Sequence, residues 1–181
     1  MAGFFKQLLA TDKLVRVFCA GRMLHPVSIQ LFGLAGGYDG FWLDAEHAGL
    51  STEQITLGAL AGRASGLGSF VRLPVTTYAT VTQALESGVD GVMAAQVGSA
   101  DEAETFLQWA KFAPRGKRGL NTQGADANFT HKSQIDLAHD ANRDHFVAIQ
   151  IETLGALEEV DQIAAIDGVD VCLSSRGRHM T

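Results

Sequence analysis

The sequence predicts an α/β protein built on a parallel sheet, and two observations support this. Short apolar runs alternate with longer segments of helical periodicity about six times along the 181 residues, which is typical of βα units. The runs are apolar almost throughout, as in strands that are covered on both faces. A chain of this length can bury one core, and no Pro-rich linker divides it. We therefore expect a single domain over residues 1–181.

The expected strands are apolar runs that end at turn-forming or polar residues. Pro74 stops the third run, and Gly91 opens the fourth. The second run ends in two acids and a histidine, Asp44, Glu46 and His47. In order along the chain, the six expected strands are residues 14–20, 39–44, 69–73, 91–97, 145–151 and 169–173.

The expected helices are marked by signals at their ends. Pro26 lies in the first turn of the first helix, and Ser51 with Gln54 forms a capping-box pattern at the second. Asp101 and Glu102 place negative charge in the first turn of the fourth, as the helix dipole favours. The expected helices are residues 26–35, 51–65, 78–87, 99–111, 133–142 and 155–166, and residues 112–131 are expected to form a long loop.

Two sheet closures fit this alternation: an open doubly wound sheet and a (β/α)₈ barrel. A nucleotide-binding open sheet is expected to carry a glycine-rich phosphate loop after its first strand. The sequence there, Cys19-Ala20-Gly21-Arg22, matches neither common form of that loop. This weakens the open nucleotide-binding sheet without excluding it.

Composition excludes several classes of function. The net charge of −6 argues against a general affinity for nucleic acid or for an anionic membrane. The N-terminal residues do not form a signal peptide, and no apolar run is long enough to span a membrane. Cys19 and Cys172 each lie in an apolar run with no metal-ligand spacing, so we expect buried free thiols in a cytoplasmic protein.

Polar residues recur where the expected strands end. If the strands form a parallel barrel, their C-terminal ends share one mouth, and these side chains converge there. The convergence predicts an active site at that mouth. The residues concerned are Asp44, Glu46, His47, Arg72, Gln96, Gln150 and Glu152.

Each of these side chains has a functional and a structural interpretation. His47 can act as a general base near neutral pH or be a surface histidine. Arg72, within an apolar strand, can hold a substrate carboxylate or pair with an internal acid. Glu152 can bind Mg²⁺ or Mn²⁺ or begin the following helix. Glu86 lies late in a helix and, taken alone, is expected to be solvated.

The loop Pro114-Arg115-Gly116-Lys117-Arg118-Gly119 is basic and punctuated by glycine. It can be a solvated loop or a mobile flap that helps to hold an anion. The residues of the loop do not favour either interpretation.

Taken together, these segments resemble the HpcH/HpaI aldolase/citrate lyase family, the class II metal-dependent pyruvate aldolases that act on 2-keto-3-deoxy sugar acids and 4-hydroxy-2-oxo-dioates. The resemblance covers roughly residues 3–171. Its motifs are Trp42-Leu43-Asp44-Ala45-Glu46-His47, Val71-Arg72-Leu73-Pro74, Leu85-Glu86-Ser87-Gly88, Gly91-Val92-Met93, the loop 114–119 and Gln150-Ile151-Glu152-Thr153.

The resemblance implies a (β/α)₈ TIM barrel of the phosphoenolpyruvate/pyruvate type. It implies that His47 is the base for proton transfer, with Glu86 as its acidic partner. It implies that Arg72 holds the pyruvyl group and stabilises its enolate. Glu152 is then a metal ligand with Gln150 beside it at the substrate, and Asp44 contacts the metal through water.

The implied reaction is cleavage of a 4-hydroxy-2-oxo acid to pyruvate and an aldehyde. The implied cofactor is a divalent metal ion, Mg²⁺ or Mn²⁺, with Co²⁺ as an alternative. The implied partner is a small-molecule 2-oxo acid, with no nucleic acid and no membrane. A complete barrel of this family is expected to form a homo-oligomer.

The sequence also departs from the family pattern. The family places a second carboxylate ligand just after the sixth strand, where this chain reads Cys172-Leu173-Ser174-Ser175-Arg176. Asp170 precedes the core of that strand and is expected at the opposite end of the barrel. A full barrel takes about 250 residues, so we expect about six βα units, truncated after the sixth strand. The alternative to an active aldolase is therefore an inactive remnant that survives only by association with another chain. A CoA-thioester lyase is disfavoured because no segment resembles a CoA site.

Overall fold

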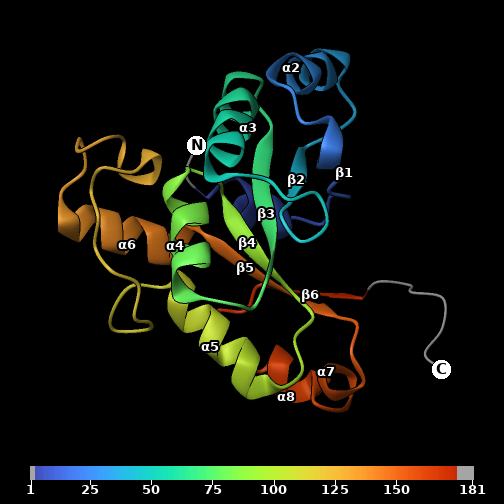
Figure 1. Ribbon diagram of the computed structural model, residues 1–181, viewed down its shortest axis with the longest axis vertical. Coiled ribbons are helices and arrows are strands. Elements are labelled where there is room, and N and C mark those ends of the chain that lie inside the picture. The colour runs from blue at the N-terminus through green and yellow to red at the C-terminus, as the bar shows by residue number, and fades with distance from the viewer. Residues whose placement is uncertain (1–2, 175–181) are drawn as a thin grey trace.

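The computed structural model describes residues 3–174 and contains one parallel sheet of six strands in the order β1-β2-β3-β4-β5-β6. A doubly wound sheet reverses its strand order at a switch point, whereas this order follows the chain throughout. The sheet curls into part of a barrel (Figure 1), which confirms the predicted barrel class with six βα units. The strands are β1 Val17–Cys19, β2 Gly40–Asp44, β3 Gly68–Pro74, β4 Gly91–Ala95, β5 Phe146–Ile151 and β6 Val171–Ser174.

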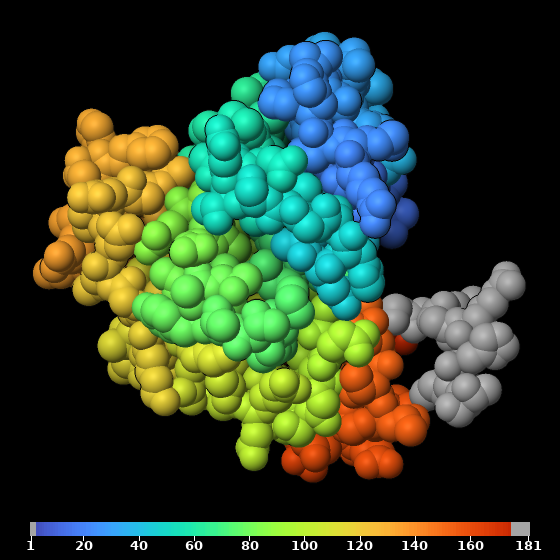
Figure 2. Space-filling model, in the orientation of Figure 1, coloured from blue at the N-terminus to red at the C-terminus, as the bar shows by residue number. Residues whose placement is uncertain are grey.

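Helices α3, α4 and α5 cover the convex face of the sheet and hide most of the strands (Figure 2). Their ends match the predicted signals closely. Ser51 and Gln54 form the reciprocal capping box of α3, and Ser99 caps α5. The helices are α1 Phe4–Leu9, α2 Pro26–Ala35, α3 Thr52–Ala64, α4 Tyr78–Glu86, α5 Ala100–Ala110, α6 Gln134–Asp144, α7 Leu154–Glu158 and α8 Val160–Ala164, with short 3₁₀ turns η1 Gly21–Met23 and η2 Ala125–Ala127.

Alternate side chains of each strand point to opposite faces of the sheet. Phe41, Leu43 and Val71 belong to the main core under the helices. Trp42 and Phe70 instead face the concave side and line an apolar cavity of about 330 Å³. Asp44 and Arg72 follow two residues later on the same strands, so they point to the concave side above that cavity.

The short helix α1 was not predicted from the sequence. It has only six residues, and its N-cap Gly3 makes no side-chain cap, so local signals are weak. Phe5 seals the N-terminal end of the curled sheet by packing edge-on against Phe70 and Phe146. A Cβ atom at Gly68 would lie 2.6 Å from the Phe5 ring, so this close approach requires glycine at the start of β3.

Two further details differ from the sequence-based expectations. The helix expected over 155–166 is split at Glu159, whose carboxylate turns to accept a 2.6 Å hydrogen bond from Ala100 N at the start of α5. Cys19 and Cys172 are free, as expected, but exposed. The expectation of burial was wrong because β1 and β6 are the two edges of the sheet.

The helices over residues 3–174 are all too short or too polar to cross a bilayer.

Candidate active site

The centre of the site is an ion pair between neighbouring strands. Asp44 and Arg72 stand opposite each other in the parallel register of β2 and β3. Arg72 Nε donates to Asp44 Oδ1 at 3.1 Å, and Arg72 Nη2 donates to Oδ2 at 2.7 Å. Both residues are 8% exposed. A guanidinium carries five N–H groups, so three of them make no hydrogen bond within residues 3–174 and are available to an incoming acid.

Asp44 also fixes the turn that follows β2. Its Oδ1 accepts hydrogen bonds from Glu46 N and His47 N, each at 3.1 Å. Burial alone would raise the pKa of Asp44, but the hydrogen bonds from Arg72 and from these backbone N–H groups outweigh it and lower the pKa below its usual value. Asp44 is therefore ionised and anchors both Arg72 and the Glu46-His47 segment.

Glu46 lies between Arg72 and His47. Its Oε2 is 3.2 Å from Arg72 Nε and 3.6 Å from His47 Nε2, and its side chain is only 11% exposed. The same oxygen is buried and accepts no hydrogen bond within the described chain. The His47 side chain is 68% exposed. The structure thus brings Asp44, Glu46, His47 and Arg72 together at the C-terminal end of the sheet.

Trp42 forms a floor beneath the guanidinium. The Arg72 Cζ atom lies 4.5 Å from the centre of the Trp42 ring, within the range of a cation–π interaction. Trp42 also stacks over Phe70. The cationic group therefore rests on an apolar layer that holds its plane on one side.

Gln150 and Glu152 lie together at the end of β5, beside Gln96 at the end of β4. Glu152 Oε1 accepts from Gln96 N at 2.9 Å, and Glu152 Oε2 accepts from Gln150 Nε2 at 2.6 Å. Gln96 adopts a left-handed φ of 57°, which turns its N–H toward Glu152. The Gln150 Oε1 atom is buried and accepts no hydrogen bond from the described residues.

These two residues offer oxygen atoms that suit a hard divalent cation. Mg²⁺ is commonly held by one or two carboxylates, with water and substrate completing its shell. Within residues 3–174 no group of three His, Cys, Asp or Glu side chains forms a metal cage. Glu152 and the Gln150 carbonyl therefore fit a cation that depends on water and substrate for its remaining ligands.

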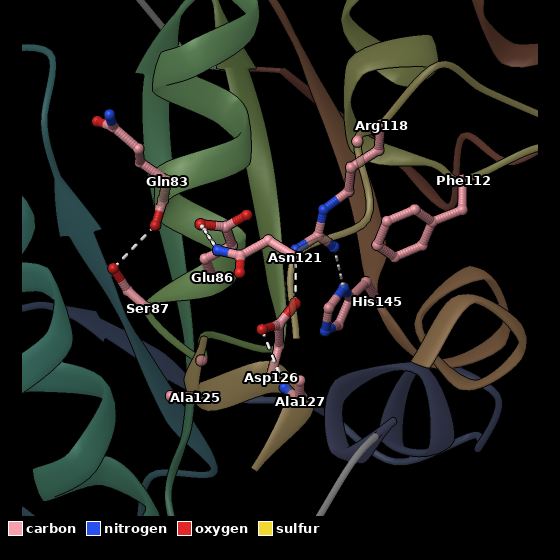
Figure 3. A network of polar contacts seen from close by, with 12 residues as sticks. Gln83, Glu86, Ser87, Phe112, Arg118, Asn121, Ala125, Asp126, Ala127 and His145 are labelled. Atoms are coloured by element: carbon pink, nitrogen blue, oxygen red, sulfur yellow. Dashed lines mark hydrogen bonds and ion pairs between the residues drawn. The ribbon is translucent and has the colours of Figure 1, made fainter. Parts of the chain in front are cut away.

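Glu86 lies apart from the His47 cluster. It is the last residue of α4, and its Oε2 accepts from Asn121 Nδ2 at 3.0 Å, as the close-up shows (Figure 3). Both residues line a surface hollow of about 270 Å³ between α3, α4 and the loop that follows α5. The pairing of Glu86 with His47 stays a prediction, because within one chain Glu86 contacts Asn121.

Both arginines of the basic loop 114–119 are paired with acids of the same chain. Arg115 makes two 2.7 Å hydrogen bonds to Glu104, and Arg118 is buried against Asp126 at 2.6 Å. Arg118 also contacts His145 Nδ1 at 3.4 Å (Figure 3). Burial, followed by the charges of Arg118 and Lys111, lowers the pKa of His145 well below its usual value.

Asp170 lies at the N-terminal end of β6, as predicted, where it pairs with Lys6 Nζ at 3.0 Å and accepts from Val147 N at 2.9 Å. The family's second carboxylate ligand is expected just after β6, and residues 175–181 of that segment lie outside the described residues.

Sequence reasoning missed the partners of the cluster. It assigned no role to Glu46 and did not place Trp42 beside Arg72. The spacing Asp-x-Glu-His after a buried strand was the available signal, but only the β2–β3 register shows which arginine the acids meet.

Comparisons with known proteins identify relatives of this chain. The sequence model of the HpcH/HpaI aldolase/citrate lyase family matches residues 25–175. A 4-hydroxy-4-methyl-2-oxoglutarate aldolase of Hapsidospora irregularis is 34% identical over 151 residues, which are 82% of this chain and 56% of that protein. A 5-keto-4-deoxy-D-glucarate aldolase of Escherichia coli is 32% identical over 168 residues, 92% of this chain and 63% of that protein. This chain thus spans about three fifths of the length of these relatives.

Solved structures show the same fold. An HpcH/HpaI aldolase from Desulfitobacterium hafniense superimposes with a TM-score of 0.88 at 28% identity, covering 96% of this chain and 66% of that one. A family protein from Burkholderia cenocepacia gives a TM-score of 0.86 at 26% identity, covering 95% and 68%. The family match spans most of the sequence and includes the Asp44–Arg72 cluster, so this chain belongs to the HpcH/HpaI aldolase/citrate lyase family.

Proposed function

We propose that this chain carries the pyruvate-handling centre of a metal-dependent aldolase that cleaves a 4-hydroxy-2-oxo acid to pyruvate and an aldehyde. The observation that carries the proposal is the buried Arg72, held by Asp44 with donor groups left over at the C-terminal mouth of the sheet. Active sites of parallel barrels lie at this end. The aldolase names of the relatives support the same class of reaction.

The chain's own residues account for binding and proton transfer. The free N–H groups of Arg72 hold the substrate carboxylate and stabilise the negative charge that develops on the 2-oxo group. His47 takes the proton of the 4-hydroxyl group, so that the C3–C4 bond breaks and its electron pair forms the pyruvate enolate while the aldehyde carbonyl forms at C4. A proton then returns to C3 and gives pyruvate. A divalent ion, when bound at Glu152 and Gln150, polarises the 2-oxo group.

A coupled assay tests this function. The full chain, supplied with Mg²⁺ or Mn²⁺ and a 4-hydroxy-2-oxo acid, is expected to release pyruvate, which lactate dehydrogenase converts with loss of NADH absorbance. Chelation of the metal and the variant Arg72→Lys are each expected to abolish most of the signal, since lysine cannot reproduce the guanidinium geometry. The proposal would be contradicted if the wild-type chain released no pyruvate, or if Arg72→Lys released it as fast as the wild type.

The second candidate is an inactive chain that persists by associating with another chain. It is supported by the exposed apolar side chains of the sheet edges, Val17 at 41% and Leu173 at 43%. Analytical ultracentrifugation tests it: a stable monomer with cooperative unfolding would remove this candidate, and an obligate complex without pyruvate release would favour it.

A further inference from the structure

We infer that Glu46 is a positioning residue that couples His47 to Arg72. The inference rests on the proposed function and deepens it, because it assigns a role to a buried acid that the reaction scheme does not use. It also provides His47 with a carboxylate partner inside the same chain, where Glu86 instead contacts Asn121.

The geometry singles out one oxygen atom. Glu46 Oε2 faces Arg72 Nε at 3.2 Å and His47 Nε2 at 3.6 Å, yet it accepts no hydrogen bond within the described chain. A buried carboxylate oxygen without a donor is costly. Arg72 Nε donates to Asp44 in this arrangement, and the His47 ring is the second neighbour that can supply a donor to Glu46.

A small rotation of the His47 side chain would close the 3.6 Å gap to hydrogen-bonding distance. With Nε2–H donated to Glu46, the other ring nitrogen, Nδ1, carries the lone pair and can act as the base. This is the usual way in which a carboxylate fixes the tautomer and direction of a histidine. Such positioning matters here because the His47 side chain is 68% exposed and otherwise free to rotate.

Asp44 and Glu46 therefore have separable effects. Asp44 makes both hydrogen bonds that anchor Arg72, so the guanidinium keeps its principal anchor when Glu46, 3.2 Å from Arg72 Nε, is replaced by the isosteric glutamine. The loss of Glu46 should instead slow proton transfer at His47. A residue that merely supported the fold would lower binding and turnover together.

The first test is isosteric replacement, Glu46→Gln, with Glu53→Gln as the matched control, because Glu53 is exposed in the first turn of α3. Exchange of the pyruvate methyl protons with D₂O, followed by ¹H NMR in the presence of Mg²⁺, reports proton transfer, and calorimetric titration with pyruvate reports binding. For Glu46→Gln we expect the exchange rate to fall on the order of 10- to 100-fold while the pyruvate Kd changes less than about threefold. Unchanged exchange, or a parallel loss of binding, would overturn the inference.

The second test does not depend on activity. Diethylpyrocarbonate modifies accessible histidines at a rate set by the nucleophilicity of the ring, and peptide mass spectrometry separates the sites. His139 has a similarly exposed side chain, 73%, and serves as an internal reference. The ratio of His47 to His139 modification is expected to fall several-fold in Glu46→Gln and to stay constant in Glu53→Gln.

These two tests separate the inference from the proposed function. Wild-type protein that neither binds pyruvate nor exchanges its protons contradicts the function, while the modification ratio still decides whether Glu46 acts on His47. An unchanged ratio overturns the coupling even if the enzyme is active.

Discussion

Asp44 and Arg72 face each other across the β2–β3 register and are joined by two hydrogen bonds of 3.1 and 2.7 Å. The pair links two strands at the mouth of the sheet. It also anchors the turn that carries Glu46 and His47, because Asp44 accepts their backbone N–H groups. One carboxylate thus sets the position of each polar group in the cluster.

Removal of this carboxylate should destabilise the fold. Asp44→Ala removes the carboxylate that accepts both side-chain hydrogen bonds of the buried Arg72, and the loss of such a partner costs about 3–5 kcal/mol. Urea denaturation monitored by circular dichroism gives the free energy of unfolding. Asp101→Ala, at an exposed helix start, should cost less than about 1 kcal/mol. Equal stabilities for the two variants would contradict this account of the pair.

Two arginines of one loop offer a comparison of buried and exposed ion pairs. Arg118 and Asp126 have side chains only 1% exposed, whereas Arg115 and Glu104 are 26% and 33% exposed. Asp126→Ala should therefore cost about 3–5 kcal/mol, and Glu104→Ala less than about 1 kcal/mol. Chemical denaturation of the two variants in parallel measures the difference. A larger loss of unfolding free energy for Glu104→Ala than for Asp126→Ala would show that burial does not determine the contribution of these pairs to stability.

Stability should depend on pH through Asp90. Burial raises its pKa to about 6, against the opposing effects of the Ser69 N–H group and Arg63. The folded protein therefore keeps this proton where the unfolded chain, with a carboxyl pKa of about 4, has lost it. The contribution of Asp90 to the free energy of unfolding falls as pH rises between those two values.

Asp90→Asn removes this titration. The wild type should lose more stability than the variant between about pH 4.5 and about pH 7, as measured by urea denaturation at several pH values. Parallel pH curves for the two proteins would show that Asp90 does not titrate in this range.

The fluorescence of Trp42 should report the binding of a ligand to Arg72. The chain has two tryptophans, so Trp109→Phe leaves Trp42 as the only one. Its fluorescence is expected to change when pyruvate binds the guanidinium 4.5 Å above the ring. Trp42→Leu should weaken pyruvate binding about three- to tenfold, the equivalent of a partly desolvated cation–π contact. The role would be excluded if Trp42 fluorescence did not change on addition of pyruvate and Trp42→Leu bound pyruvate as tightly as the wild type.

The sequence predicts most of the fold because hydrophobic runs and capping residues are local signals. Ser51 and Gln54 marked the start of α3 correctly, and Pro26 marked the start of α2. The helix α1 was not predicted because its stability comes from Phe5 packing on Phe70 and Phe146. Such contacts between distant segments leave no periodic pattern in the chain.

The site was predicted as a set of residues rather than as an arrangement. Asp44, His47 and Arg72 were each found from their positions at strand ends. The role of Asp44 as the partner of Arg72, and the place of Glu46 between Arg72 and His47, depend on strand register and on a turn of a few residues. Neither can be inferred from composition or spacing.

The most direct test of the central claim is proton exchange on pyruvate itself, since it requires no knowledge of the aldehyde partner. In D₂O with Mg²⁺, the wild-type chain is expected to remove the pyruvate methyl signal from the ¹H NMR spectrum. Arg72→Lys should slow this exchange on the order of a hundredfold, because the charge that develops on the 2-oxo group loses its guanidinium donors. Exchange no faster than in protein-free buffer, or equally fast in Arg72→Lys, would contradict the assignment of Arg72 to the pyruvyl group.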